Sequence, residues 1–125
     1  MKGIKILVIV SAVCLSFSLA FGDCLRGDCR NGRGTFEYPN GDRYTGCFVN
    51  GKMEGRGTLQ SADGSKYVGE FRNNMLNGQG ILIRANGVKY VGQFKNNRIH
   101  GKGTLTGPGG KKMVGNFNAG EFVGK

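Results

Sequence analysis

Apolar and polar residues alternate along most of the chain after residue 22, and glycine recurs at regular places within this alternation. The segment 44–48 reads Tyr-Thr-Gly-Cys-Phe, and related segments recur at 67–71, 90–94 and 113–117. A second pattern, Gly-x-Gly followed by Thr or Ile and then by Phe or Leu, begins at residues 32, 55, 78 and 101. A period of two residues is typical of a β-strand with one buried face. Each pattern therefore predicts one strand of a hairpin.

Both patterns return after 23 residues, which predicts a repeat architecture. A turn glycine keeps the same step, at Gly41, Gly64, Gly87 and Gly110. The predicted organisation after the N-terminal segment is a degenerate first repeat at 23–43, full repeats at 44–66, 67–89 and 90–112, and a truncated repeat at 113–125.

The turns suggest how the strands pair. The segment 38–42, Tyr-Pro-Asn-Gly-Asp, predicts a three-residue hairpin loop, because Pro sets φ at the first turn position and Gly accepts the left-handed position. The expected pairs across this loop are Phe36 with Tyr44, Gly34 with Gly46 and Gly32 with Phe48. The expected pairs across the connection 49–54 are Phe48 with Gly55, Gly46 with Gly57 and Tyr44 with Leu59.

These registers place an apolar row, an all-glycine row and a row that alternates glycine with phenylalanine on one face. Aromatic rings are expected to cover the backbone of the glycine row. The repeat positions that define this face are Tyr44, Gly46, Phe48, Tyr67, Gly69, Phe71, Tyr90, Gly92 and Phe94. The opposite face is expected to be mostly polar, with Thr45, Arg56, Glu70, Gln79, Gln93 and Lys102. The predicted fold class is all-β, an elongated single-layer antiparallel sheet of stacked β-hairpins.

The first 22 residues have the organisation of a signal peptide. Lys2 and Lys5 accompany the start of an apolar run, and Ala20-Phe21-Gly22 supplies the small residues of a cleavage site. We expect cleavage after Gly22 and export to the medium, the periplasm or the cell envelope. A retained membrane anchor is the alternative, although the apolar run is shorter than the roughly 18 residues that span hydrocarbon.

The motif Tyr-x-Gly-x-Phe, then Asn-Gly or Asn-Asn, then Gly-x-Gly-Thr-Leu resembles the MORN (membrane occupation and recognition nexus) repeat. The segment 90–105 is similar to the family consensus over its whole length, and the resemblance covers residues 36–125. It implies an elongated sheet of stacked hairpins. It also implies roles in binding acidic phospholipids, in scaffolding or dimerisation, or as an appendage to enzymes; the repeats leave no room here for an enzyme domain.

The composition excludes some fold classes, and the net charge indicates the kind of partner. Glycine accounts for 24 of 125 residues with only 2 prolines, which excludes a collagen helix and disfavours a helical bundle.

The net charge of +10 favours an anionic partner. Four cations hold one repeat position just before the Tyr strands and are candidates for binding an anionic lipid or another polyanion: Arg43, Lys66, Lys89 and Lys112. The alternative is a solvated edge that keeps the sheet soluble. Nucleic acid is disfavoured by the expected export.

Cysteine usage agrees with an oxidising compartment. Cys24 and Cys47 are 23 residues apart and are expected at equivalent positions, too far apart for a disulfide. We expect a Cys24–Cys29 disulfide that staples the first hairpin and leaves Cys47 unpaired. An Arg-Gly-Asp sequence lies inside this loop, and coincidence accounts for it. No set of residues predicts a metal site, a cofactor site or catalysis.

Two functions therefore remain open. The first is a non-enzymatic binding or scaffold module that binds a protein partner or self-associates, with an exposed edge strand near Met113–Phe117. The second is a peripheral binder of anionic lipid headgroups or another polyanionic surface through the basic column. The sequence does not identify the partner.

Overall fold

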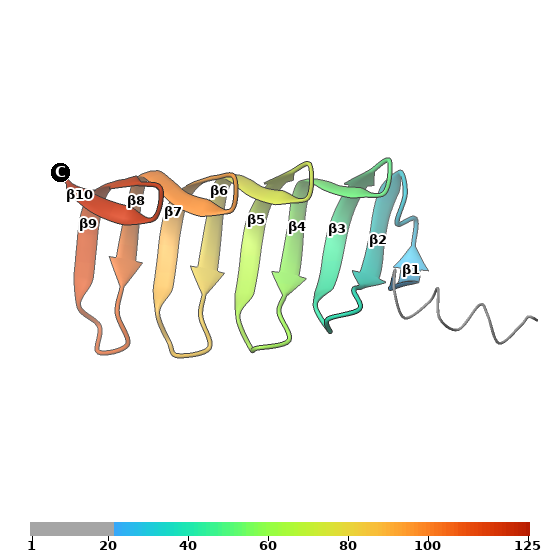
Figure 1. Cartoon of the computed structure of the whole chain (residues 1–125), viewed down its shortest axis with the longest axis horizontal. Helices are drawn as coiled ribbons and strands as arrows, with labels where there is room; N and C mark the ends of the chain where they lie inside the picture. Colours follow the sequence, from blue (N-terminus) through green and yellow to red (C-terminus); the bar gives the residue numbers. More distant parts are fainter. Residues whose placement is uncertain (1–21) are drawn as a thin grey trace, which may run out of the picture.

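The computed structural model describes residues 22–125, so the predicted signal peptide, apart from Gly22, lies outside the described residues. Ten strands form one antiparallel sheet in which each strand pairs with its neighbours in sequence (Figure 1). The strands are β1 (Asp23–Gly27), β2 (Gly32–Glu37), β3 (Arg43–Val49), β4 (Lys52–Gln60), β5 (Lys66–Arg72), β6 (Met75–Ile83), β7 (Lys89–Lys95), β8 (Arg98–Thr106), β9 (Lys112–Asn118) and β10 (Glu121–Gly124). The predicted fold class, an elongated single-layer sheet of stacked hairpins, is confirmed.

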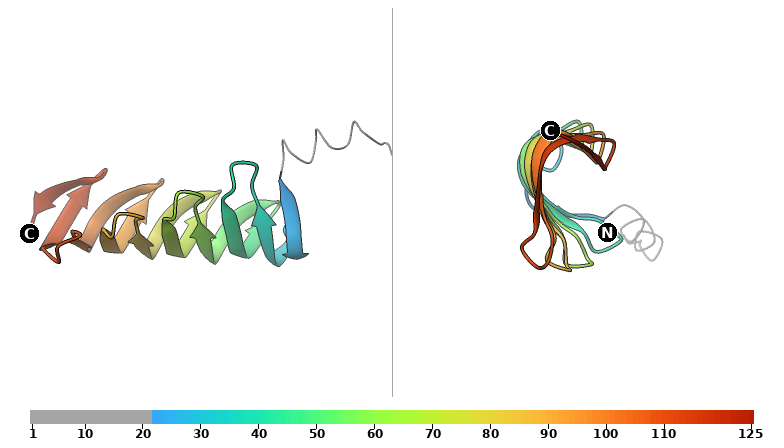
Figure 2. Two further views of the ribbon diagram at one scale, coloured as in Figure 1. Left: turned by 90° about the horizontal axis from the view of Figure 1, so that it is seen from below. Right: turned by 90° about the vertical axis from the view of Figure 1, so that its left-hand side faces the viewer.

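Each strand of the sheet bends along its length (Figure 2). Seen along the stack, the strands superimpose as one C-shaped layer (Figure 2). Long turns line one side of the stack and tight turns line the other (Figure 1).

The long turns have the predicted three-residue form. The Tyr38 backbone N–H donates to the Asp42 carbonyl at 2.8 Å, and Gly41 takes a φ of 95°. The same closure recurs 23 residues later, where the Ser61 N–H donates to the Ser65 carbonyl at 2.8 Å. Proline or alanine at the first position and glycine at the third therefore set the register on this side.

The tight turns have two residues, both with positive φ. Asn73 and Asn74 have φ of 51° and 68°, and Asn96 and Asn97 have φ of 48° and 70°. Asparagine tolerates this left-handed region better than most residues, and its twist matches that of the flanking strands. The Asn-Gly and Asn-Asn pairs of the repeat are thus the hairpin turns.

The expected register across these tight turns is partly wrong. Gly46 pairs with Gly57 and Tyr44 with Leu59 as expected, but Phe48 pairs with Met53 instead of Gly55. The cause is the tightness of the turn, which pairs the two residues that flank it and leaves three residues of β4 opposite one residue of β3. Gly55 instead pairs with Phe71 of β5. The row of alternating glycine and phenylalanine therefore exists between repeats and not within each hairpin.

The extra residues form a bulge that glycine makes possible. Gly55, Gly78 and Gly101 occupy it with φ of 83°, 101° and 87°. At the second and third bulges, a side chain of the preceding strand accepts from the backbone N–H that follows the glycine. Glu70 Oε1 accepts from the Gln79 N–H at 2.8 Å, and Gln93 Oε1 accepts from the Lys102 N–H at 3.0 Å.

The aromatic rings form the core. Tyr44, Tyr67 and Tyr90 are at most 2 % exposed and lie over the glycine row. Each tyrosine hydroxyl donates to a main-chain carbonyl three residues later, and for Tyr67 this is the Glu70 carbonyl at 2.9 Å. A single-layer sheet thereby buries large side chains without a second layer. We call this side of the sheet the ring face.

Ring contacts also join one repeat to the next. Tyr67 packs edge-to-face on Phe71 of its own repeat, with ring centroids 5.1 Å apart, and on Phe94 of the next, 5.0 Å apart. The tight turns add backbone links, since the Asn97 side-chain oxygen accepts from the Leu76 N–H at 2.8 Å. Each hairpin is thus held by its neighbours, as expected for a solenoid-like stack.

Both ends of the sheet differ from the predictions. Cys24 pairs with Phe36, the partner that Tyr44 has on the other side of β2, so Cys24 and Cys47 are not at equivalent positions. A register irregularity between Cys24 and Arg26 in β1 accompanies this shift. At the other end, β10 pairs with residues 116–118 of β9, so the edge strand expected near 113–117 is only partly unpaired.

Candidate functional site

The side of the sheet opposite the rings, which we call the open face, is mostly polar as expected, but its middle row is partly apolar. Its middle row consists of β-branched residues from seven successive strands, which we call the valine stripe: Thr45, Thr58, Val68, Ile81, Val91, Thr104 and Val114. Its four aliphatic members are 37–53 % exposed. The sheet therefore leaves four aliphatic side chains of this row partly exposed to water, with threonines at the other three positions.

The four predicted cations lie together in one row beside this stripe, the first basic row. Arg43, Lys66, Lys89 and Lys112 are the first residues of β3, β5, β7 and β9, and all are exposed. Arg43 Nη2 lies 3.3 Å from Glu37 Oε2, which is the one ion pair within residues 22–125. The three lysines of the row therefore have no carboxylate partner in the described part of the chain.

A second basic row, which we did not single out from the sequence, lies on the other side of the stripe. It consists of Arg33, Arg56, Lys102 and Lys125, which follow the repeat length with Gln79 at the third position, and Glu70 of β5 pairs with Arg56 in the same row. Its cations follow the same 23-residue step as the cations of the first row. The open face thus presents one row of regularly spaced cations, the valine stripe, and a second row in which cations alternate with neutral residues and Glu70.

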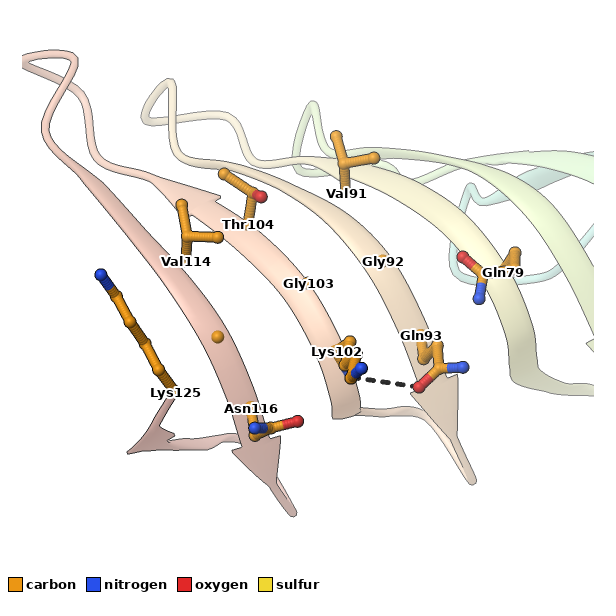
Figure 3. Close-up of a pocket in the computed structure, with 11 residues that line it drawn as sticks. Gln79, Val91, Gly92, Gln93, Lys102, Gly103, Thr104, Val114, Asn116 and Lys125 are labelled. Atoms are coloured by element: carbon orange, nitrogen blue, oxygen red, sulfur yellow. Dashed lines mark hydrogen bonds between the residues drawn. The ribbon is translucent and has the colours of Figure 1, made fainter.

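The stripe and the second row border a shallow depression of about 780 Å³ near the C-terminal end (Figure 3). Its lining includes Val91, Thr104, Val114 and Lys102, and Lys125 lies at the outer edge of the sheet (Figure 3). The lining also includes the bare backbone of the glycine row. The depression combines apolar and cationic groups on a surface that is open to solvent.

The disulfide loop lies away from this surface. Cys24 and Cys29 are joined by a disulfide, with their Cα atoms 5.8 Å apart. The Asp28 carboxylate accepts from the N–H groups of Asn31 and Arg30 at 2.9 Å each, and these hydrogen bonds lower its pKa. The acid of the Arg-Gly-Asp sequence therefore caps its own turn.

The remaining reactive side chains have local partners. Cys47 has a free thiol, and its sulfur accepts from Arg33 Nη1 at 3.6 Å. His100 Nδ1 accepts from the Ala119 N–H at 3.2 Å and so links the last two hairpins. Residues 22–125 contain no cluster of three or more His, Cys, Asp or Glu side chains that fits a metal ion.

The pKa values of the buried tyrosine hydroxyls are raised mainly by burial in the fold. Burial raises the pKa of Tyr44 and Tyr67 to about 12. Burial raises the pKa of Tyr90 as well. All three hydroxyls donate to main-chain carbonyls, so these groups stabilise the sheet.

Stacked hairpins with one ring-covered face and one open face define a β-hairpin repeat protein. The model of the MORN repeat family matches residues 26–43, 44–66, 67–89 and 90–112, and the chain belongs to this family. The comparison with individual characterised proteins found no match to this chain. The family is generally one of binding and scaffold modules. No helix among the described residues has the length and apolar character of a membrane span.

Proposed function

We propose that the protein is an exported, non-enzymatic scaffold that binds a protein partner on the open face and associates with itself through its sheet edge. The observation that supports partner binding is the valine stripe. Val68, Val91 and Val114 are 40 %, 43 % and 53 % exposed in a row along the stack, and a row of exposed apolar groups favours a contact surface.

A photo-cross-linking amino acid at Val91 tests partner binding in the cells that produce the protein. Discrete adducts with other proteins are expected from this position. The same amino acid at Gly109, where no neighbouring atom lies within 4 Å of an added Cβ, is the control for non-specific reaction. If Val91 gives no more adducts than Gly109, partner binding on the open face is wrong.

Self-association is supported by the free edge of β10, which carries the exposed residues Phe122 and Val123. Light scattering after size exclusion tests it on the purified protein. A mass above that of one chain is expected at tens of micromolar. A strictly monomeric mass would contradict this part of the proposal.

Export is supported by the pattern of residues 1–22, and the Cys24–Cys29 disulfide agrees with an oxidising compartment. Expression in a host with the matching secretion pathway tests it. The exported protein is expected to begin at Asp23. A cell-retained protein that keeps Met1 would exclude cleavage and favour a retained anchor.

A second candidate function is peripheral binding to anionic lipid headgroups. It is supported by the first basic row, whose three lysines have no carboxylate partner within residues 22–125. Regularly spaced cations attract anionic surfaces at low ionic strength.

A further inference from the structure

The last tight turn, which joins β9 to β10 at the end of the stack, is attached to the preceding hairpin through a histidine (Figure 1). In the second and the last tight turns, the first turn residue donates its backbone N–H to a side chain 19 residues earlier in the chain. Asn73 donates to Glu54 Oε1 at 3.1 Å, and Ala119 donates to His100 Nδ1 at 3.2 Å. Histidine is the side-chain type whose charge changes between about pH 5 and 8. The acceptor in the last turn is therefore one that mild acid can remove.

The second residue of the last turn gives less support than its counterpart in the turn before. Gly120 donates its N–H to the Ile99 carbonyl at 2.8 Å, as Asn97 does to the Leu76 carbonyl at 3.0 Å. The Asn97 side-chain oxygen also accepts from the Leu76 N–H at 2.8 Å. Glycine has no side chain and cannot return such a bond. The last turn is thus linked to β8 by the bonds of Ala119 and Gly120 alone, and one of them ends on His100.

The β10 strand depends on this turn. It has 4 residues, against 9 in β8, and pairs with β9 over residues 116–118. Its Phe122 ring packs on Phe117, with centroids 5.2 Å apart. Short segments at the end of a sheet open locally at a lower free energy than the interior strands. A loss of contact at the turn therefore loosens β10 before it affects the rest of the sheet.

The chemistry of the imidazole ring makes the turn contact sensitive to protons. A neutral ring has one accepting and one donating nitrogen, whereas a protonated ring has two donors. Because Nδ1 of His100 accepts from Ala119, the neutral ring carries its proton on Nε2. Protonation of Nδ1 places one N–H group against another, so the hydrogen bond to the turn is lost.

The charged groups around the ring do not offset the new charge. Those on the elements near it are Lys95 of β7, Arg98 and Lys102 of β8, Glu70 of β5 and Glu121 of β10. None of them forms an ion pair within residues 22–125. Lys95 and Arg98 lie opposite each other and line one hollow with His100. A protonated ring adds a third positive charge there, and like charges at neighbouring strand positions are destabilising.

We propose that His100 makes the attachment of the last hairpin pH-sensitive, so that protonation of its ring releases the β9–β10 turn from β8 and loosens β10. His100 is the single histidine of the chain. The regulatory consequence rests on the proposed self-association, because β10 carries the free edge that supports it. Mild acid then weakens self-association reversibly.

Amide hydrogen exchange of the purified protein at about pH 7.5 and about pH 5.5 tests the attachment. Rates are expressed as protection factors, which removes the pH dependence of the exchange chemistry itself. Protection of residues 118–123 is expected to fall about three- to tenfold at the lower pH, the effect of losing one exposed hydrogen bond. Protection of the turn at Asn73, where the acceptor is a carboxylate, is expected to stay the same.

Matched variants assign the effect to His100. His100→Asn supplies an acceptor that does not titrate, as Asn31 does for the Asn50 N–H at 3.0 Å, and is expected to make the protection independent of pH. It also separates the ring from the α-amino group, which titrates in the same range. His100→Lys keeps a cation without an acceptor and is expected to give low protection at both pH values. Thermal melts show whether each variant remains folded.

The outcomes separate the attachment from self-association. Unchanged protection in the wild type, or an equal fall in His100→Asn, would overturn the proposal. Light scattering at both pH values measures the consequence, and the wild-type mass is expected to fall toward one chain in acid while that of His100→Asn does not. A mass above one chain that ignores pH would overturn the regulatory part. A single-chain mass throughout, with pH-dependent protection, would remove self-association and leave the attachment by His100 intact.

Discussion

The hydroxyl of Tyr67 lies where a side chain on Gly69 would begin. An ideal Cβ added to Gly69 comes within 2.7 Å of the Tyr67 hydroxyl oxygen and within 2.5 Å of Gly80 Cα on the neighbouring strand. The ring is 2 % exposed because two glycines leave this space free. The glycine row is therefore part of the core and not a flexible interruption of the strands.

Replacement of Gly69 by alanine is expected to displace the Tyr67 ring and destabilise the protein. Overpacking of this kind costs about 1–3 kcal/mol, which lowers the melting temperature of a domain of this size by at least about 4 °C. Circular dichroism melts measure it. Gly109→Ala is the control, since an added Cβ there meets no atom within 4 Å. Equal melting temperatures for the two variants would show that the rings do not need the glycine row.

The predictions from the sequence succeeded where local residues set the geometry. Pro39 and Gly41 determine the length of the first long turn, so the pairing of Phe36 with Tyr44 was predicted correctly. Across the tight turns only the pair nearest the turn, Phe48 with Gly55, was wrong, because Asn-Asn and Asn-Gly pairs close in two residues and the bulge at Gly55 absorbs the difference. Glycine spacing alone does not distinguish a bulge from a paired position.

The candidate surface was predicted only in part. The first basic row followed from the repeat step, whereas the valine stripe was missed because the polar members of the opposite face were considered first. Thr45, Val68, Val91 and Val114 are also one repeat apart and are visible in the sequence. Their exposure follows from the predicted single-layer sheet, which has no second layer on this face within the described residues.

Alkaline pH is expected to unfold the protein through its buried tyrosines. Burial raises the pKa of Tyr44 and Tyr67 in the folded state to about 12, above the value of about 10 for an exposed phenol. Between these values the unfolded chain has lost protons that the folded chain retains, so the free energy of unfolding falls as pH rises from about 10 to 12. Below about pH 9 these groups add no pH dependence.

Denaturant midpoints between pH 7 and 12, measured beside the phenolate absorbance near 295 nm, check this expectation. The absorbance and the loss of ellipticity are expected to rise together, well above pH 10. Tyr90→Phe is expected to lower the absorbance change while keeping the ring packing. Full ionisation of all four tyrosines near pH 10 with the fold intact would contradict the burial of their hydroxyls.

Lipid binding through the first basic row predicts a charge-dependent and position-dependent association with vesicles. Lys66, Lys89 and Lys112 are spaced by two strands, about 9–10 Å, so one anionic surface can contact all three. The triple change of these lysines to glutamate is expected to abolish flotation with vesicles that contain phosphatidylserine.

The control carries the same charge change at the tight-turn end of the sheet, with Lys52→Glu, Lys95→Glu and Arg98→Glu, and is expected to float more than the first-row variant. Equal flotation of the two variants would assign the attraction to net charge alone, because both differ from the wild type by the same six charge units, and the first basic row would then have no specific role at a membrane.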